Sequence, residues 1–477
     1  MRTSWHRLGF GRQKLMTSAG AQLSRRATLA GSAAAFAAAC ALTGCAADPS
    51  PVMDPVLDLT SAPPQPADTD LGNRIGTGPG LEVAGQTLNT DLLRRFYAHN
   101  GFEPVWTSRQ TQVDSLLNVV RNAGDQGLDP ELFHASALRH RDDLPPIDAD
   151  LLLSDAFLSY ADALARGAVP VERRKNDETL SPGPIDVADV LNDALDNDPA
   201  GAIEALAPTT PTYQALLQAL QKQQTGATAG DAASASRLRA IEVNLERQRW
   251  LPRSLPTERV WVNVADESLI FYRADLPVFS TRVVVGQDAT NKQSPEFRAM
   301  IEASFFNPPW VVPSDIVKAE IQPLIDHDPD YLTKNDMILL ANGDAEQLPG
   351  PEAGLGLIMF DMPNRFDVFL HDTPDRDIFN LNNRRISHGC IRVQNPVELA
   401  SLLLQQSTDT IHQEIAAGGT TRHDLPDPVP VFVVYETAFV DTDGTLQFRP
   451  DFYKRDDEIW QLLQKHSQGQ GSAAQPV

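Results

Sequence analysis

Residues that could carry covalent chemistry gather in one stretch of this 477-residue chain, where His371 precedes a polar loop and His388, Cys390 and Arg392 follow it. A thiol is a poor nucleophile until it ionises, and a neighbouring imidazole can accept its proton and, as a cation, lower its pKa. Gly389 places no side chain beside the sulfur, so backbone N–H groups could approach a developing oxyanion. The pattern predicts a cysteine nucleophile activated by histidine.

Two other interpretations of the same residues stay open. Two histidines and a cysteine could bind zinc, although a fourth ligand and a second cysteine are not evident nearby. Alternatively, Cys390 is an inert buried thiol beside histidines that make structural hydrogen bonds. The nucleophile interpretation requires no metal and no other cofactor.

Strands must position these side chains. Apolar runs and alternation predict a mostly β domain. Its strands are expected at 260–264, 282–285, 366–370 and 431–435. His371 then ends one strand and Cys390 begins another, so pairing of those strands would bring the two side chains together. His388 would share a face with Cys390 if that stretch is extended.

Two further elements accompany the strands. A helix is expected through Leu404, because Asn395, Pro396 and Glu398 supply an N-cap, a first-turn proline and a capping-box acid. The segment 313–354 is too long for a hairpin and carries a helical pattern from Ile316 to Ile325. It is expected to fold over the site as a lid, with a packed structural insertion as the alternative.

The first 44 residues have the composition of an export signal. Basic residues precede an apolar run from Ala27 to Leu42, which is shorter than the about 20 residues of a membrane-spanning helix. The run ends in a Leu-Thr-Gly-Cys tetrad that resembles a bacterial lipobox, so Cys45 is expected to carry a lipid. An ordinary cleaved signal with an incidental cysteine is the alternative. Ala46 resembles the residue found in lipoproteins released to the outer membrane, whereas Sec and twin-arginine export are not distinguished.

The remaining chain is predicted to be an α+β multidomain protein. Helical periodicity after Leu92 predicts an N-terminal helical domain, and the period changes to that of strands after Trp250. The expected divisions are a Pro/Ala-rich tether at 45–80, the helical domain at 81–224, a linker at 225–240, the β domain at 241–440 and a C-terminal extension at 441–477.

Charge and cysteine content exclude several classes of protein. The 63 acidic and 40 basic residues give a formal net charge of −23, which disfavours nucleic-acid binding through a general basic surface. Loss of the signal would leave Cys45 and Cys390 of the 3 cysteines. With Cys45 committed to lipid, Cys390 has no intramolecular disulfide partner.

The stretch from Ser387 to Arg392 resembles the signature of the L,D-transpeptidases of bacterial peptidoglycan, the YkuD-domain enzymes. The likeness is to the large scaffold-domain subgroup, whose helical region resembles this chain from about Leu92 to Leu220. Further motifs carry the same resemblance: Asn244–Arg247, Trp250–Pro252, Phe306–Trp310, Val312–Pro313, Leu348–Pro351 and His371–Pro374.

The resemblance implies roles for individual residues. Cys390 would be the acyl-accepting nucleophile and His371 its base, oriented by the backbone carbonyl of Asp372. The residues lining the oxyanion site would be His388 and the amides of Gly389 and Cys390. Arg392 would position the active loop or a substrate carboxylate, with an internal salt bridge as the alternative, and Trp310 is expected to contact substrate.

The implied reaction is attack of Cys390 on a peptidoglycan stem peptide, followed by transfer of the thioester to an amine of a neighbouring stem. Carbapenems would acylate the same sulfur. Two alternatives remain: an L,D-carboxypeptidase or hydrolase with the same residues, and a catalytically idle lipoprotein that binds peptidoglycan. The expected location is the periplasm, with a lipid anchor in the outer membrane.

The chain departs from the family pattern in two places. Residues 225–236 leave no room for a separate peptidoglycan-binding module. Ahead of Pro349, the residues Glu346-Gln347-Leu348 differ from those usual in the family.

Overall fold

The computed structural model describes residues 62–78, 80–225, 232–289 and 291–468, which belong to one compact unit. The export signal, Cys45 and most of the tether lie outside the described residues. Among the described residues, no helix has the length and apolar composition needed to cross a membrane.

The N-terminal part is helical, as predicted, and its longest helix is α6 (Pro146–Arg166), which is apolar on most of its circumference and buried among the others. The other elements are α2 (Asp70–Ile75), β1 (Glu82–Val83), β2 (Gln86–Thr87), α3 (Thr90–His99), α4 (Gln110–Arg121), α5 (Ala135–Leu138), α7 (Val187–Ala194), α8 (Pro199–Glu204) and α9 (Pro211–Thr225). One apolar core joins most of these helices, whereas α9 belongs to a separate, smaller apolar cluster.

The linker expected at 225–240 is shorter than predicted. Helix α10 spans Ala232–Arg249, so most of the second half of that range is helical. The helix forms because Ile241 and Leu245 pack against Tyr213 and other apolar residues of α9. An apolar contact with the preceding helix therefore overrides the small-residue composition that suggested a linker.

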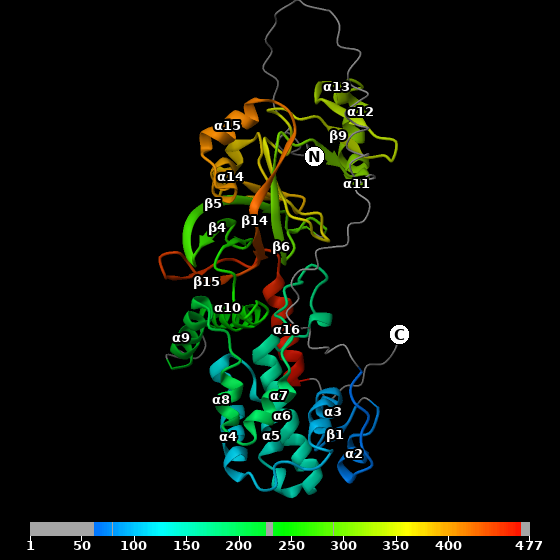
Figure 1. Ribbon diagram of the computed structural model, residues 1–477, viewed down its shortest axis with the longest axis vertical. Helices are drawn as coiled ribbons and strands as arrows, with labels where there is room; N and C mark the ends of the chain where they lie inside the picture. The colour runs from blue at the N-terminus through cyan, green and yellow to red at the C-terminus, as the bar shows by residue number, and fades with distance from the viewer. Residues whose placement is uncertain (1–61, 79, 226–231, 290, 469–477) are drawn as a thin grey trace, which may run out of the picture. The chain divides into compact units, whose positions relative to one another are not determined.

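The mostly β domain contains a nine-stranded sheet in the order β12-β5-β13-β11-β10-β6-β14-β3-β4. Its strands are β3 (Arg259–Asn263), β4 (Ser268–Arg273), β5 (Leu276–Gly286), β6 (Phe297–Phe306), β10 (Ile358–Asp361), β11 (Leu370–His371), β12 (Arg385–Ser387), β13 (Ile391–Val393) and β14 (Thr421–Val434). Because β4 also pairs with β5, the sheet curls back on itself as a barrel. The architecture confirms the predicted α+β fold (Figure 1).

The strand predicted at 366–370 is wrong except for its last residue. Asp367 has φ 51°, and the side-chain oxygen of Asn364 accepts hydrogen bonds from the N–H groups of Phe366 and Val368. This side-chain-centred turn satisfies backbone groups that a strand would have paired. Alternating apolar residues thus lie in a turn that leads directly into β11.

Two helices follow β13. The predicted helix is confirmed as α14 (Pro396–Leu404), and α15 (Thr408–Ala416) comes next. Leu399, Ala400 and Leu403 of α14 join the core of the barrel, and Figure 1 shows both helices beside β14. The predicted capping role of the Asn395 side chain is not observed, because its oxygen accepts a hydrogen bond from Thr281 of β5 instead.

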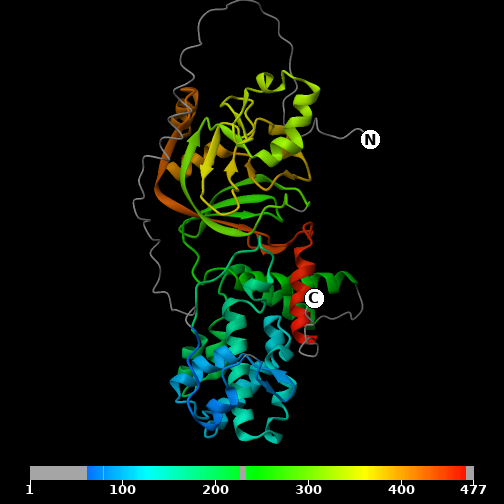
Figure 2. The same ribbon diagram turned by 90° about the vertical axis from the view of Figure 1, so that its right-hand side faces the viewer.

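Residues 313–354, which we call the lid segment, form a small folded piece together with the short strand before them. It contains α11 (Ser314–Ile316), a π-helical turn at Val317–Ile321, α12 (Gln322–His327), α13 (Tyr331–Lys334), and the three-stranded sheet of β7 (Trp310–Val312), β9 (Ala345–Gln347) and β8 (Met337–Leu339). It has an apolar cluster of its own, and Figures 1 and 2 show its helices grouped beside the strands.

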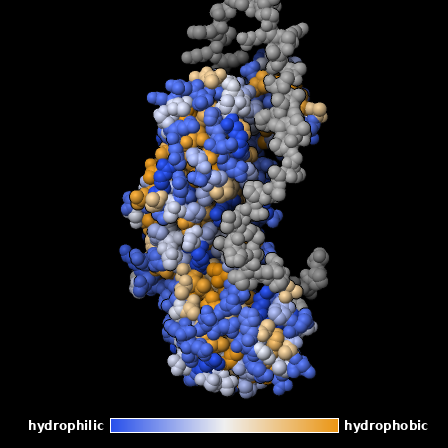
Figure 3. All heavy atoms as spheres, viewed as in Figure 1, coloured by the Kyte–Doolittle hydropathy of each residue, from blue (hydrophilic) through white to orange (hydrophobic). Residues whose placement is uncertain are grey.

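The surface is mainly hydrophilic on the face shown in Figure 3. Several large apolar side chains nevertheless remain exposed in or next to the lid segment: Val311, Leu324, Ile338 and Leu339. Strand β5 of the barrel also exposes Leu276 and Val278.

The C-terminal residues pack closely on the rest of the protein. After β14 come β15 (Ala438–Val440), β16 (Leu446–Phe448) and α16 (Arg455–Gln468). The strand predicted at 431–435 is therefore not the last one, and it corresponds to the final residues of the longer strand β14, which ends at Val434. Ile459 and Leu463 of α16 join the core of the helical domain. The C-terminal helix consequently ties the helical and barrel regions together.

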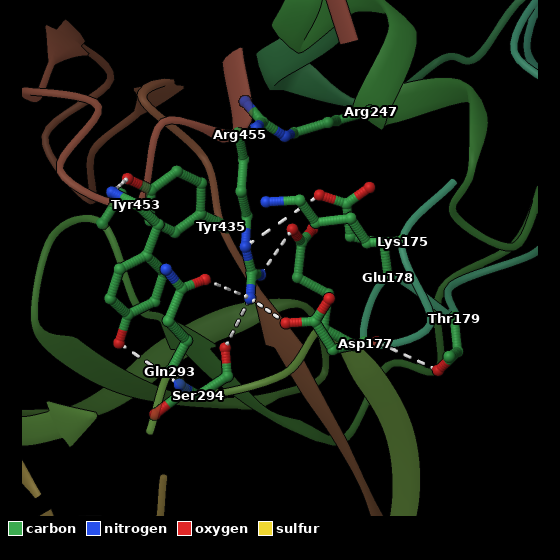
Figure 4. A network of polar contacts seen from close by, with 12 residues as sticks. Lys175, Asp177, Glu178, Thr179, Arg247, Gln293, Ser294, Tyr435, Tyr453 and Arg455 are labelled. Carbon is green, nitrogen blue, oxygen red and sulfur yellow. Dashed lines mark hydrogen bonds and ion pairs between the residues drawn. The ribbon is translucent and has the colours of Figure 1, made fainter. Parts of the chain in front are cut away.

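A buried ionic network lies where these regions meet. Arg455 is fully buried and donates to Glu296 at 2.9 Å and to Asp177 at 2.6 Å, while Glu178 lies 3.9 Å from its Nε (Figure 4). The backbone N–H of Glu296 also donates to the carbonyl of Asp177, at 2.7 Å. An extended segment of the helical domain is thus joined to the residues just before β6.

Candidate active site

The two strands that carry the predicted nucleophile and base are neighbours. Strands β11 and β13 pair in parallel, with Leu370 opposite Ile391 and His371 opposite Arg392. Residues directly opposite each other project from the same face of a sheet, and so do residues two apart in an extended strand. Arg392 lies opposite His371 in the strand pair and two residues after Cys390 in the chain. Its charge changes the pKa of both residues. The structure therefore places Arg392 within electrostatic reach of both His371 and Cys390.

His371 is buried at 4% exposure, and its ring is fixed by backbone groups. Nδ1 lies 2.6 Å from the carbonyl oxygen of Asp372, which is the expected orienting contact. Burial, helped by the positive charge of Arg392, lowers the pKa of His371 to about 3, although hydrogen bonds to the Asp372 and Leu355 carbonyls oppose the shift. The neutral ring with its proton on Nδ1 leaves Nε2 as a proton acceptor.

Cys390 is half-buried, and its sulfur lies 3.8 Å from the carbonyl oxygen of Asp367. Burial raises the pKa of this thiol above its ordinary value, while the N–H of Phe369 and the charge of Arg392 act in the opposite direction. The prediction that an imidazolium lowers the pKa of Cys390 is therefore not supported, because His371 is neutral. Burial thus favours the thiol form of Cys390 and the neutral form of His371.

Arg392 projects among these groups without an acidic partner. Its buried Nε has no hydrogen-bond partner, and no ion pair joins it to an acidic side chain of the described residues. Burial lowers the pKa of Arg392, and the nearest opposing charges are those of a Cys390 thiolate and Asp375. The internal salt bridge considered for Arg392 is not formed, which leaves its donors for a bound anion.

The backbone of the signature differs from the expected oxyanion site. Gly389 has φ 120°, a conformation that favours glycine, and its N–H donates to Oγ of Ser387 at 3.2 Å. The same hydroxyl donates to the carbonyl of Cys390 at 2.6 Å. In the described part of the chain the N–H of Cys390 donates no hydrogen bond. Among the described residues, the N–H of Cys390 is therefore unpaired, whereas that of Gly389 is not.

The ring of His388 is not directed to an oxyanion. Its Nε2 lies 2.6 Å from Oε1 of Glu320, in the π-helical turn of the lid segment, and 2.8 Å from Nζ of Lys292. Lys292 also donates to Glu320, at 3.2 Å. The prediction that His388 and Cys390 share a face is wrong, because Gly389 turns the chain between them. His388 instead connects the signature to the lid segment.

The other two predicted residues have structural contacts. The carboxylate of Asp372 accepts from the N–H of Leu357 at 2.9 Å and from Arg376 at 2.5 Å. Trp310 packs against the apolar cluster of the lid segment, close to Gly354. A substrate contact of Trp310 thus stays a prediction, because the contacts seen for its partly buried ring lie within that segment.

The zinc interpretation finds no support in the geometry. The rings of His371 and His388 have different hydrogen-bonding partners. Among the described residues, no three His, Cys, Asp or Glu side chains are grouped so that they could bind a metal ion.

Three residues near the signature were not predicted from the sequence: Lys292, Ser294 and Glu320. Ser294 donates to the carbonyl of Gly389 at 2.7 Å, although about a hundred residues separate the two. No local spacing signals such a contact, because it depends on the loop after β5 returning to the signature.

Comparisons with known proteins match both regions of the chain. Residues 257–431 match the YkuD family, described as the L,D-transpeptidase catalytic domain, and residues 91–220 match the Scaffold domain. A protein of Haemophilus influenzae named "Putative L,D-transpeptidase" is 25% identical over 409 residues, which cover 79% of this chain and 82% of that protein.

A solved structure also matches, the Ldtfm-avibactam carbamoyl enzyme, at 12% identity over 42% of this chain and 63% of that chain. Its TM-score of 0.20 is too low to support an argument from structure. The two family matches and the observed architecture do not depend on this comparison. The chain combines a Scaffold domain with a catalytic domain of the YkuD family of L,D-transpeptidases.

Proposed function

We propose that this protein is a peptidoglycan L,D-transpeptidase that cross-links stem peptides through a thioester on Cys390. The observation that supports the proposal most is the parallel pairing of β11 and β13, which gathers His371, Cys390 and Arg392 inside the matched catalytic domain. Each of the three supplies one element of acyl transfer: a base, a nucleophile and an anion-binding cation.

The first half-reaction forms the thioester. Nε2 of His371 accepts the thiol proton as the sulfur attacks the carbonyl carbon of the diamino acid at the third stem position. The N–H of Cys390 stabilises the negative charge that develops on the carbonyl oxygen. The carbon–nitrogen bond then breaks, and the proton held by His371 passes to the leaving amine of terminal D-Ala.

A neutral His371 suits this sequence. A base that is already protonated at neutral pH could not accept the thiol proton, whereas a pKa of about 3 keeps the ring free. A base with such a low pKa is weak, so a stable thiolate–imidazolium pair does not form before the attack. Proton transfer must instead accompany formation of the carbon–sulfur bond. This explains how a thiol with a raised pKa can still react.

The second half-reaction restores the enzyme. The amine of a neighbouring stem attacks the thioester carbon, the carbon–sulfur bond breaks, and the sulfur recovers a proton through His371. Water in place of the amine would give the L,D-carboxypeptidase or hydrolase. Contact of Glu320 with His388 supports a lid segment that limits access of water to the thioester.

Arg392 is proposed to bind a carboxylate of the stem peptide. Its guanidinium is half-buried, without an acidic partner among the described residues, and on the face of the sheet that carries the reacting groups. A cation in this situation gains more from a substrate anion than a fully solvated one would, because water screens it less.

The protein is further proposed to act in the periplasm from an outer-membrane lipid anchor on Cys45. The basic and apolar pattern of residues 1–44 and the tetrad ending at Cys45 support this proposal. Replacement of Cys45 by Ala should move the protein to the soluble periplasmic fraction while its activity in solution is kept. Continued membrane association of the variant would contradict the anchor.

Intact-protein mass after incubation with a carbapenem tests the nucleophile. The sulfur opens the β-lactam ring, the ring nitrogen takes the proton, and the whole inhibitor mass is added once. One adduct that peptide mapping assigns to Cys390 supports the enzyme, and no adduct at any dose favours the idle peptidoglycan-binding lipoprotein. Muropeptide analysis of treated sacculi then separates cross-linked dimers from trimmed stems.

A further inference from the structure

We propose that Ser294 is a positioning residue that holds the peptide between Gly389 and Cys390, so that the N–H of Cys390 faces the developing oxyanion. Oγ of Ser294 donates to the carbonyl of Gly389 at 2.7 Å and accepts from the N–H of Gly286 at 3.0 Å. Ser294 is fully buried. The inference rests on the proposed function, because it assigns a purpose to the amide that would meet the oxyanion.

The planar peptide bond couples the direction of the Gly389 carbonyl to that of the Cys390 N–H. The carbonyl of Gly389 and the N–H of Cys390 belong to one peptide group, and in a trans peptide these two bonds point in opposite directions. A hydrogen bond to the carbonyl therefore sets the direction of the N–H. The N–H itself has no acceptor in the described residues, so it is free to bind a ligand.

Such a constraint is needed at this position. Gly389 has no side chain to restrict rotation of its peptide, and its φ of 120° lies where other residues rarely go. Without an external hydrogen bond, the flanking peptide would sample more orientations. An oxyanion donor acts best when its direction is fixed before the charge develops.

Ser294 is in turn held by groups that have no other role in the site. Its N–H donates to the hydroxyl of Tyr453 at 3.2 Å, and the same hydroxyl donates to the carbonyl of Gly286 at 2.6 Å. The carbonyl of Ser294 accepts a hydrogen bond from Arg455 at 3.1 Å (Figure 4). Every polar group of Ser294 is therefore used, and the loop cannot shift without breaking buried hydrogen bonds.

Close packing of this loop on β5 depends on Gly286. A Cβ atom at that position would collide with the carbonyl of Lys292 and with the N–H of Ser294. Glycine thus allows the loop to approach β5 closely enough for Ser294 to reach the signature. The ionic contacts of Arg455 with Asp177 and Glu296 extend the same support to the helical domain.

The test compares two reactions of one sulfur. Acylation by a carbapenem creates an oxyanion, whereas alkylation by iodoacetamide displaces iodide and creates none. Replacement of Ser294 by Ala should slow acylation at least about tenfold, since removal of a complete oxyanion donor costs about 10²–10³. The alkylation rate should stay within about twofold of the wild type. Ser294→Thr, which keeps the hydroxyl, should restore most of the acylation rate.

Ser304→Ala is the matched control. Ser304 is also fully buried in this domain, but its hydroxyl has no hydrogen-bond partner among the residues that the structure describes. Its loss should change neither rate. Equal acylation by Ser294→Ala and wild type would overturn the proposal, and so would a parallel fall of acylation and alkylation in a destabilised variant, because that would indicate packing alone.

A second measurement does not depend on activity. The chain has 3 cysteines, so ¹⁵N-cysteine labelling gives a simple NMR spectrum in which the Cys390 amide can be assigned through Cys390→Ala. Loss of the hydrogen bond to the preceding carbonyl should displace or broaden the Cys390 signal in Ser294→Ala and not in Ser304→Ala. An unchanged signal would overturn the proposal. Failure of the wild type to react with carbapenem would instead contradict the proposed function.

If Ser294→Ala does not fold, Tyr453→Phe replaces it. This variant removes the hydroxyl that binds the N–H of Ser294 and keeps the aromatic ring. Acylation should then fall about threefold relative to alkylation, since the hydroxyl of Ser294 remains but its support is weaker. No selective effect in a folded Tyr453→Phe protein would overturn the proposal.

Discussion

Glu320 of the lid segment lies 2.6 Å from the ring of His388 in the signature, which makes this pair the direct link between the lid segment and the residues around the nucleophile. Nζ of Lys292 lies 2.8 Å from the same ring nitrogen, so Nε2 either donates to Glu320 or accepts from Lys292. In both cases Lys292 also binds Glu320. Three side chains from three separate segments therefore hold the lid segment in this position.

Glu320→Gln should favour hydrolysis over transfer. A partly exposed ion pair is worth at most about 1 kcal/mol, which corresponds to about a fivefold change in the population of an open lid. The ratio of trimmed stems to cross-linked dimers should rise by up to that factor. The control is Asp328→Asn, which disrupts the Asp328–Lys334 ion pair within the lid segment. Equal ratios in both variants and the wild type would contradict a lid held by Glu320.

The alkylation rate of Cys390 should rise with pH and show no plateau near neutrality. Burial raises the pKa of the thiol, and His371 stays neutral down to about pH 3, so little thiolate exists at pH 7. The iodoacetamide rate should increase about tenfold per pH unit between pH 7 and the thiol pKa, which ordinarily is about 8.5. A constant rate from pH 6 upward would reveal a thiolate–imidazolium pair and contradict this description.

Arg392→Gln should weaken substrate binding without loss of stability. The guanidinium is half-buried and lacks an acidic partner in the described residues, so its removal takes away a charge that is poorly solvated and leaves no unpaired acid. Urea unfolding should give an unchanged free energy or a gain of about 1 kcal/mol. KM for a stem peptide should rise more than kcat falls. Strong destabilisation would show that Arg392 has a structural role.

Glu178→Gln should alter the pH dependence of stability. Burial next to Glu296 raises the pKa of Glu178 to about 7, although Arg455 opposes the shift. The folded protein therefore binds a proton more readily than the unfolded chain, and the associated stability is lost as pH rises from about 4.5 to about 7. The variant should gain about 1–3 kcal/mol over the wild type between pH 5 and pH 8. A pH-independent difference would contradict a titrating Glu178.

Local patterns in the sequence predicted much of the fold, and the misses have physical causes. The predicted pairing of the strands next to His371 and Cys390 is found in β11 and β13. The false strand at 366–370 arose because the side chain of Asn364 replaces strand partners with a turn, which alternation cannot indicate. The helix at 232–240 depends on contact with α9, which composition does not encode.

The site was predicted unevenly for a similar reason. The carbonyl of Asp372 orients His371 as expected, since the two residues are adjacent in the chain. The direction of His388 was wrong because it depends on φ of Gly389 and on Glu320, a residue of another segment. The pKa of Cys390 was expected to fall, but burial, which no motif reports, decides its direction. Chemistry set by neighbours in sequence was predictable, whereas chemistry set by burial and distant loops was not.

Cys390 is the group that forms the cross-link in the proposed reaction. Cys390→Ala removes the sulfur from a half-buried position, so the thermal unfolding temperature should change little while the nucleophile is lost. The measurement is muropeptide analysis of sacculi incubated with purified wild type or Cys390→Ala protein. We expect new dimers linked through the third stem residue with the wild type and none with the variant. Dimers formed at equal rates by a folded Cys390→Ala protein would contradict the account.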